Sequence, residues 1–286
     1  MANLLVKWKM KEQCEWLASE PGEGRIVVYR SERFDRAKVV LMLHGLGDNW
    51  HCHRPAAAIF ESLGYSWIGF DWPGHGNSEG RRGDIPGVDE AHEIIDEVLA
   101  KFGIEDFCLY AHSTGGFLSL LKAQEDGWKT RIRWMWLSSP LLKPTHGQAQ
   151  AKIKAAKLMA ATVPHLTIPT GARYEKCCHT KELAPGAFDR VFAGCHGMIS
   201  TRFGCSLLLA EEQLNQTVLA FPFPVLVTQG DEDKICPPKF SVELIKRLQS
   251  PEKSLLYLDY LRHEPLKEPK LSNFSQNVRA WLVGKD

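Results

Sequence analysis

The sequence predicts an α/β fold, in which a mostly parallel central sheet is flanked by helices. Short apolar runs, such as VVLML at 39–43, alternate with segments of helical periodicity, such as 88–102. This alternation is typical of a parallel sheet that is covered on both faces. The chain has 286 residues, of which 44% are hydrophobic and 24% charged, the composition of a globular protein. Its length suits one large domain or two small ones.

The predicted elements follow one another in a regular order. Strand-like runs lie at 13–18, 25–30, 39–43, 66–70, 106–111, 132–137, 225–228 and 254–258. Helical spacing is found at 55–63, 88–102, 114–123, 240–248 and 273–283. The strands are short and continuously apolar, whereas the helix at 88–102 gathers its apolar residues on one side. We therefore expect strands that are joined by helices and paired in parallel.

One stretch interrupts this order. Residues 141–221 are about eighty residues of helix-leaning sequence between two predicted strands, which is too long for a connecting loop. Prolines bracket the stretch on both sides, at 140, 144, 222 and 224. We predict a core formed by 1–140 and 222–286, with 141–221 inserted as a helical cap.

Charge and cysteine content limit the partners and the compartment. Lys and Arg total 35 and Asp and Glu 34, so there is no basic excess of the kind that nucleic-acid binding requires. The eight cysteines include no C-x-x-C pair, which favours reduced thiols. The apolar run before Lys7 is only three residues long, too short for a secretory signal or a membrane span. We expect a cytoplasmic protein, and the oligomeric state stays open.

The stretch 109–120, LYAHSTGGFLSL, joins a predicted strand to a predicted helix through small residues. This is the setting of a nucleophile elbow, in which a serine is held on a strained turn. The residues two positions before and after Ser113 must be small, and they are Ala111 and Gly115. The usual pattern has glycine at both places, and we expect the extra methyl of Ala111 to be tolerated. The alternative is an ordinary turn in which Ser113 caps the helix.

A serine nucleophile needs a base and an acid, which on this fold follow in the order serine, acid, histidine. Only one of the eleven histidines follows residue 196, so His263 is the candidate base. The loop after the strand at 225–228 offers Asp231, Glu232 and Asp233 as candidate acids.

An oxyanion hole needs two backbone N–H groups that point at the developing negative charge. One donor is expected to be Thr114, directly after the nucleophile. The other is expected from the glycine-containing loop HGLGD at 44–48, where Leu46 is our candidate.

Five sequence blocks carry a resemblance to a known family. They are LMLHGLGDN (41–49), FDWPGHGNSEGRRG (70–83), YAHSTGG (110–116), QGDEDKICPP (229–238) and RHEPLKEP (262–269). Together they resemble the α/β-hydrolase superfamily, and within it the monoacylglycerol lipase and lysophospholipase-like serine hydrolases, also described as serine aminopeptidase-like. The second block is the most specific. The stretch 141–221 resembles the group only in length and position.

The resemblance implies roles for individual residues. Ser113 matches the nucleophile, Asp233 the acid and His263 the base. Leu46 and Thr114 match the backbone donors of the oxyanion hole. The implied reaction is the hydrolysis of a carboxylic ester through an acyl-enzyme, with no metal and no organic cofactor. Monoacylglycerols or lysophospholipids are the first expected substrates and short soluble esters the second.

Other functions remain open at this point. A peptidase or a carbon–carbon bond hydrolase can use the same triad, and a catalytically silent binding protein can share the fold. Dehalogenases and epoxide hydrolases of this fold use a carboxylate nucleophile, which Ser113 argues against.

Clusters of His and Cys at 50–53, 177–179 and 195–196 fit no regular zinc spacing, so we expect no metal. The helix expected at 151–159 could shield an acyl chain or touch a membrane, although a solvated helix is the simpler interpretation.

Overall fold

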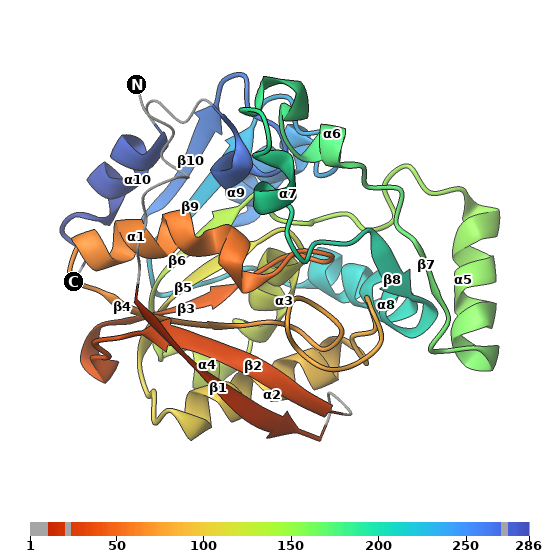
Figure 1. Ribbon diagram of the computed structural model, residues 1–286, viewed down its shortest axis with the longest axis horizontal. Coiled ribbons are helices and arrows are strands. Elements are labelled where there is room, and N and C mark those ends of the chain that lie inside the picture. Colours follow the sequence, from red (N-terminus) through yellow and green to blue (C-terminus); the bar gives the residue numbers. More distant parts are fainter. Residues whose placement is uncertain (1–10, 21–23, 270–273, 286) are drawn as a thin grey trace.

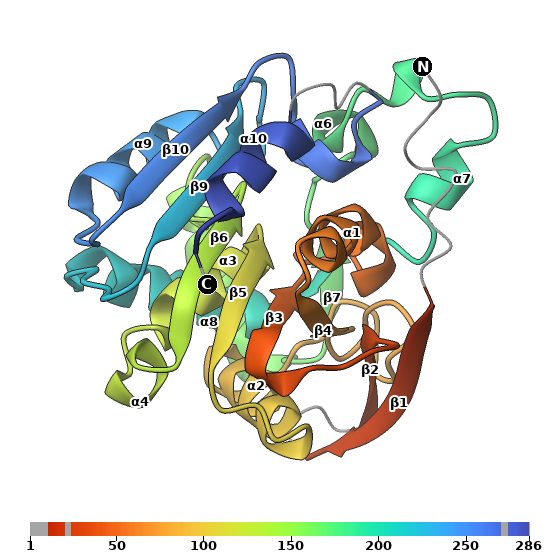
Figure 2. The ribbon, with the colours of Figure 1, turned by 90° about the vertical axis from the view of Figure 1, so that its left-hand side faces the viewer.

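A twisted eight-stranded sheet forms the centre of the computed structural model, which describes residues 11–20, 24–269 and 274–285 (Figures 1 and 2). The strands are β1 (Glu12–Ser19), β2 (Gly24–Ser31), β3 (Val39–Leu43), β4 (Ser66–Phe70), β5 (Phe107–His112), β6 (Ile132–Ser138), β9 (Val225–Gly230) and β10 (Lys253–Leu258). Their order across the sheet is β1-β2-β4-β3-β5-β6-β9-β10. The pairs β1–β2 and β2–β4 are antiparallel, and all the pairs from β4 to β10 are parallel.

Helices cover both faces of this sheet. Successive side chains of a strand point to opposite faces, so Val40 and Met42 pack on one side and Leu41 and Leu43 on the other. The first face is covered by α1 (Arg54–Ser62) and α10 (Phe274–Leu282). The second is covered by α2 (Val88–Lys101), α3 (Thr114–Lys122), α8 (Thr201–Gln216) and α9 (Pro238–Arg247). The two buried clusters exclude water from both faces, and this burial is the main stabilising contribution.

The predicted fold class is confirmed, and every predicted strand and helix of the core lies within two residues of an observed one. The helix expected at 273–283 corresponds to α10, and residue 273 itself lies outside the described residues. The short helix α4 (Asp126–Lys129) was not predicted, since four residues are too few to show helical periodicity. None of the helices in the described ranges is both long and apolar enough to cross a membrane.

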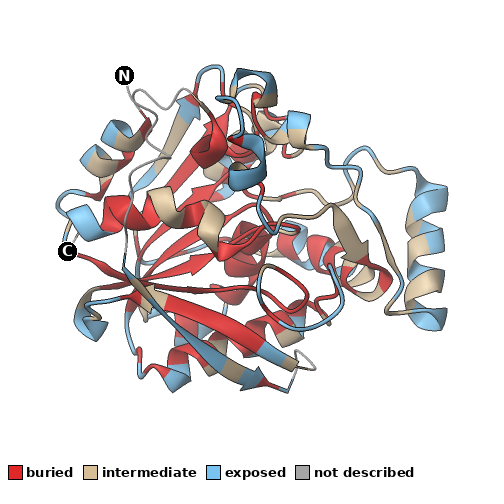
Figure 3. Ribbon diagram, in the orientation of Figure 1, coloured by how far each residue is buried: buried red, intermediate tan, exposed pale blue. Residues whose placement is uncertain are grey.

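The stretch 141–221, called the cap segment below, contains α5 (Gln150–Thr162), α6 (Tyr174–Cys177), α7 (Phe188–Val191) and α8. It also contains two short antiparallel strands, β7 (Thr167–Pro169) and β8 (Met198–Ser200), which the expectation of a purely helical cap did not include. Strands of three residues give no periodic signal. Helix α5 lies at the right-hand edge of the molecule in Figure 1, beside α8, and Figure 3 shows it largely exposed. By contrast, Phe203 and Leu207 of α8 are buried in the main core.

Candidate active site

Three of the predicted site residues lie in loops at the carboxyl ends of parallel strands. Ser113 follows β5, Asp233 follows β9 and His263 follows β10. The carboxyl ends of parallel strands meet at one edge of a sheet, which is where open α/β sheets place their functional groups. The parallel pairing of β5, β9 and β10 therefore brings Ser113, Asp233 and His263 to the same edge, although they are far apart in the sequence.

Ser113 lies on a strained turn between β5 and α3. Its backbone has φ 50° and ψ −115°, a conformation that non-glycine residues rarely adopt and that costs about 1–3 kcal/mol. Gly115 permits the turn, because a Cβ at this position would lie 2.6 Å from the carbonyl oxygen of Leu43. Ala111 is fully buried in β5, and the sheet accommodates its methyl. The departure from the usual glycine therefore leaves the turn intact.

The side chains of the three residues form one hydrogen-bonded chain. His263 Nε2 lies 3.0 Å from Ser113 Oγ, and His263 Nδ1 lies 2.8 Å from Asp233 Oδ2. All three residues are buried, with exposed fractions of 8% for Ser113, 4% for His263 and 3% for Asp233. This arrangement allows the imidazole to accept the serine proton while the carboxylate fixes its orientation.

Asp233 is held in place by the loop that follows β9. The backbone N–H groups of Ile235 and Cys236 each donate to its Oδ1 at 2.8 Å, and Gln229 Nε2 donates to its Oδ2 at 2.9 Å. Asp231 is exposed, and Glu232 lies 3.3 Å from the imidazole of His179 instead. Of the three acids that the sequence offered, the structure brings only Asp233 to His263.

The electrostatic surroundings of His263 favour its protonated form. Burial lowers the pKa of the imidazole, but the negative charge of Asp233 opposes this effect, with a further contribution from the neighbouring Cys236. The net result is a pKa well above the ordinary value for histidine. The same ion pair would stabilise the imidazolium that forms when Ser113 loses its proton.

The two expected oxyanion donors lie beside Ser113. Leu46 and Thr114 line the same cavity as Ser113 and His263. Thr114 is the first residue of α3, so its N–H has no partner within the helix. Across the described ranges, neither the N–H of Leu46 nor that of Thr114 donates to a protein acceptor. Both groups are therefore available to a ligand.

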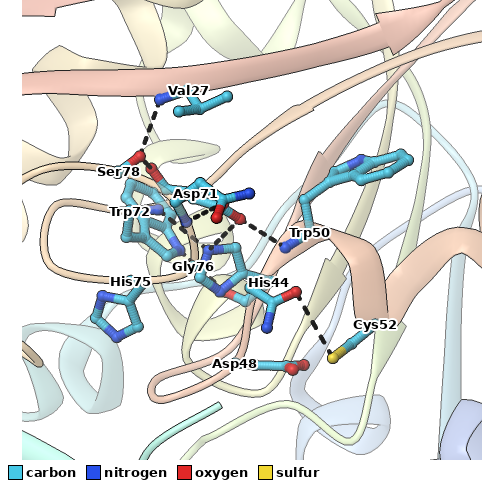
Figure 4. Close-up of polar contacts among 12 residues, drawn as sticks. Val27, His44, Asp48, Trp50, Cys52, Asp71, Trp72, His75, Gly76 and Ser78 are labelled. Carbon is cyan, nitrogen blue, oxygen red and sulfur yellow. Dashed lines mark hydrogen bonds and ion pairs between the residues drawn. The ribbon is translucent and has the colours of Figure 1, made fainter. Parts of the chain in front are cut away.

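The loop that carries Leu46 is held by Asp71, at the end of β4 (Figure 4). The fully buried carboxylate accepts hydrogen bonds from the backbone N–H of Trp50 at 2.8 Å and of Asn77 at 2.9 Å. Gly76 allows this contact, because a Cβ there would lie 2.1 Å from Asp71 Oδ2. The most specific sequence block, 70–83, thus has a structural function, which is to join the loop after β4 to the loop after β3.

His44 completes this junction as a neutral side chain. Trp72 donates its backbone N–H to His44 Nε2 at 3.1 Å, and His44 Nδ1 lies 2.8 Å from the carbonyl oxygen of Gly45. Burial lowers the pKa of His44 to about 3. Because Nε2 accepts a hydrogen bond, the single proton lies on Nδ1, where it can bond to Gly45. The loop that carries Leu46 (44–48) is therefore held in place on both sides of this residue.

A cavity of about 500 Å³ opens above Ser113 and His263. Apolar side chains from the cap segment supply much of its wall: Leu141, Ile153, Ile168, Ile199, Leu207 and Leu208. Within the described ranges, four lysines, Lys143, Lys152, Lys176 and Lys234, also line it, and Glu264 is the one carboxylate in its wall. A cavity of this size and composition suits a small, largely apolar ligand.

A buried ionic cluster that the sequence did not predict lies beside the triad. Lys267 Nζ is 2.8 Å from Asp48 Oδ1 and 3.4 Å from Glu264 Oε1. His53 also binds Asp48, at 2.8 Å, and His112 Nε2 lies 3.3 Å from Glu264 Oε2. His112 thus contacts this cluster and also lines the cavity. The charged residues of RHEPLKEP (262–269) hint at such a cluster in the sequence. Their partner Asp48 is too distant in the sequence for the pairing to be predicted.

The donor atoms near the site are already engaged with one another. Among the residues that the structure describes, three groups of His, Cys, Asp or Glu have ligand atoms within 4.8 Å of each other, and two of them include Asp48. The ammonium of Lys267 already neutralises Asp48, and the third group contains the hydrogen-bonded pair of Asp233 and His263. A metal ion would have to displace these partners, so the chemistry of the site is better explained by the protein side chains alone.

Comparisons with known proteins were made on both sequence and structure. Residues 35–270 match the family model described as serine aminopeptidase, S33. The chain is 26% identical to rat monoglyceride lipase and 25% identical to the human one, in each case over 85% of this chain and 82% of the relative. It is also 27% identical to an uncharacterized abhydrolase domain-containing protein of Dictyostelium discoideum, over 85% of this chain but only 26% of that longer protein.

Solved structures show the same architecture. The crystal structure of a monoacylglycerol lipase from Paleococcus ferrophilus superposes with a TM-score of 0.75 at 25% identity, covering 97% of this chain and all of the other. A soluble variant of monoglyceride lipase from Saccharomyces cerevisiae, solved with a substrate analog, gives a TM-score of 0.78 at 19% identity and covers 99% of both chains. The second likeness concerns the fold alone.

Proposed function

The chain belongs to the serine aminopeptidase, S33, family of α/β-hydrolases, and from this premise we propose that it hydrolyses monoacylglycerols or similar single-chain lipid esters, with Ser113 as nucleophile. The observation that carries the proposal is the chain of contacts Ser113–His263–Asp233 at the base of a largely apolar cavity. The predicted class of enzyme, a carboxylic ester hydrolase of the esterase and lipase kind, is confirmed by the family and by its relatives.

The geometry supports the following reaction. His263 Nε2 lies 3.0 Å from Ser113 Oγ and accepts its proton. At the same time the serine oxygen attacks the ester carbonyl. Asp233 holds the imidazole in the tautomer that presents Nε2 to the serine. The N–H groups of Leu46 and Thr114 would stabilise the oxyanion, each by roughly 3 kcal/mol. His263 then protonates the leaving alcohol, and water hydrolyses the acyl-enzyme by the same steps.

The substrate class rests on the cavity and on the relatives. Apolar side chains of the cap segment would surround an acyl chain that extends from Ser113. Several relatives with coverage similar to that of the rat protein are named monoglyceride or monoacylglycerol lipases, from mammals, yeast and a mycobacterium. A single-chain lipid ester is therefore our proposal ahead of short soluble esters.

The charge of the cavity argues against an aminopeptidase, despite the family's name. An aminopeptidase must bind the positively charged amino terminus of a peptide, for which a carboxylate is the natural partner. Four lysines line this cavity, and its one carboxylate, Glu264, already faces Lys267 and His112. A substrate with a free ammonium next to the scissile bond would meet repulsion here.

A panel of esters tests the proposal. It contains p-nitrophenyl esters of rising chain length, a monoacylglycerol, a lysophospholipid and an aminoacyl amide, assayed with the wild type and with Ser113→Ala. We expect turnover of the monoacylglycerol, and a loss in the variant on the order of 10⁶-fold. An unchanged Tm would show that the variant is folded. Turnover that persists in Ser113→Ala, or hydrolysis of the amide alone, would contradict the proposal.

We further propose a cytoplasmic enzyme whose cap segment contacts lipid surfaces. Helix α5 carries Lys152, Lys154 and Lys157, and Leu158 beside them is 66% exposed. Such a helix can lie at the interface of a membrane. Absence of binding to anionic liposomes in a flotation assay would refute the membrane contact.

A further inference from the structure

Two cysteines from distant parts of the chain face each other where the core meets the cap segment. Cys52 lies in the 3-10 helix Trp50–His53 of the core, and Cys195 lies between α7 and β8. Their Sγ atoms are 3.5 Å apart, although the residues are 143 positions apart in the sequence. Both residues are of intermediate burial, and their sulfur atoms are already in contact. The pair therefore lies near the surface, where a small oxidant can approach it.

Two hydrogen bonds hold the segments that carry the two sulfur atoms together. The N–H of His196 donates to the carbonyl oxygen of Gly47 at 2.7 Å, and Asn49 Nδ2 donates to the carbonyl oxygen of Ala193 at 2.8 Å. These bonds join residues 193–196 of the cap segment to residues 47–49 of the core. Gly47 directly follows Leu46, the proposed oxyanion donor. The contact between Cys52 and Cys195 is thus part of a junction between the cap segment and the loop that carries Leu46.

The surroundings give the two sulfurs different roles. The ammonium of Lys267 lies 3.8 Å from Cys195 Sγ, where it can donate a hydrogen bond to the sulfur. Cys195 Sγ also lies 3.4 Å from Asp48 Oδ1, which can accept its proton in a hydrogen bond. The pKa of Cys52 is raised well above its ordinary value, mainly because its thiol is hydrogen-bonded to Cys195, and further by burial. Because Cys195 contacts both an ammonium and a carboxylate that can accept its proton, we assign it as the attacking sulfur and Cys52 as the resolving one.

We propose that a hydroperoxide oxidises Cys52 and Cys195 to a reversible disulfide, which fastens the cap segment to the loop that carries Leu46. In the first step Cys195 Sγ attacks hydrogen peroxide. An S–O bond forms and the O–O bond breaks, and the hydroxide that leaves takes the proton of Cys195 to become water. In the second step Cys52 Sγ attacks the sulfenic sulfur. The S–S bond forms and the S–O bond breaks, and a second water leaves with the proton of Cys52. The thiols lose two electrons and the peroxide gains them.

The disulfide would change both stability and the freedom of the cap segment. The sulfur atoms must approach from 3.5 Å to about 2.05 Å, which draws the two loops together. The bond closes a long loop of the unfolded chain, so it should stabilise the folded state. Ile199, four residues after Cys195, lines the cavity. A disulfide at Cys195 would therefore limit the movement of the cavity wall that an acyl chain must pass. Long-chain esters should therefore react more slowly with the oxidised enzyme.

The experiment compares the protein before and after treatment with hydrogen peroxide or with the thiol oxidant diamide. Trypsin should release the peptides 39–81 and 191–202 as one linked species, and each of these contains a single cysteine. We expect a mass loss of two hydrogens, a Tm several degrees higher, and a fall of kcat/KM for a long-chain ester by at least about threefold. Dithiothreitol should reverse all three changes.

Serine variants supply the controls. Cys52→Ser and Cys195→Ser should show neither the linked species nor the loss of rate, whereas Cys14→Ser, at an exposed cysteine of β1, should respond like the wild type. Absence of the linked peptides in the wild type overturns the proposal, whether or not the variants fold. So does a linked protein with an unchanged rate. An equal loss of rate in Cys52→Ser would also overturn it, and would indicate oxidation of Cys236 beside the triad. The peptide and Tm readouts do not depend on the identity of the substrate.

Discussion

Helices α3 and α5 both contribute to the wall of the cavity, but they are built in opposite ways. All nine residues of α3 are buried, whereas none of the thirteen residues of α5 is (Figure 3). The elbow before α3 is held in a strained conformation by close packing on both sides. Strain of this kind persists only where the surroundings over-determine it. The proposed chemistry is therefore located in the rigid part of the molecule, and the part that would select the acyl chain is the least constrained.

This difference leads to distinct expectations for the two regions. A change near the triad should alter the rate for every ester by the same factor, because the carbonyl chemistry is common to all. A change in α5 should alter which ester is preferred and leave the chemistry intact. The following three predictions test whether chemistry and ester preference are separated in this way. Failure of any one of them would count against the separation.

The largest effect is expected for Asp233→Asn. We expect kcat/KM to fall on the order of 10⁴-fold for short and long esters alike, because the amide cannot hold the required tautomer. Activity needs the neutral imidazole, so the wild type should lose activity as the pH falls through the raised pKa of His263. Without the carboxylate this pKa should drop, and the residual activity should persist to lower pH. A pH profile of kcat/KM measures this, and an unmoved acid limb would contradict it.

A matched pair of leucines tests the difference in packing. Leu118 in α3 is fully buried, whereas Leu158 in α5 is 66% exposed. Leu118→Ala should lower the free energy of unfolding by roughly 2–5 kcal/mol, because it leaves a cavity in the core. Leu158→Ala should change it by no more than about 0.5 kcal/mol. Urea titrations of both variants give the two values, and equal losses would show that α5 is more tightly packed than the structure indicates.

The smallest effect is expected for Ile153→Ala, in the part of α5 that lines the cavity. The variant should lose preference for long over short acyl chains by up to about tenfold, since a few methylene contacts are removed. Its Tm and its kcat for a short p-nitrophenyl ester should match the wild type. Assays over the ester series provide the measurement, with Leu158→Ala as a control on the same helix. A uniform loss across the series would mean that α5 also affects the chemistry.

Much of the core could be predicted from the sequence, because the signals are local. Continuous apolar runs become strands buried on both faces, and the run at 39–43 is one of them. Ser113 is the candidate nucleophile because an elbow restricts the residues two positions away to small ones. His263 is the candidate base because of its order in the chain. In these cases the physical requirement falls on residues next to one another, so it is visible in the sequence.

The sequence by itself therefore determined the alternation of strands and helices, and it singled out Ser113 and His263 as candidates. The residues alone left Asp231, Glu232 and Asp233 open as acids, and the resemblance pointed to Asp233. In the tertiary structure the loop after β9 buries Asp233 against His263, whereas Asp231 is exposed. The tertiary structure alone brought Lys267 to Asp48 across 219 positions, and Cys195 to Cys52 across 143. Contacts between distant residues leave no local pattern, because they depend on how the cap segment and the core loops pack against each other.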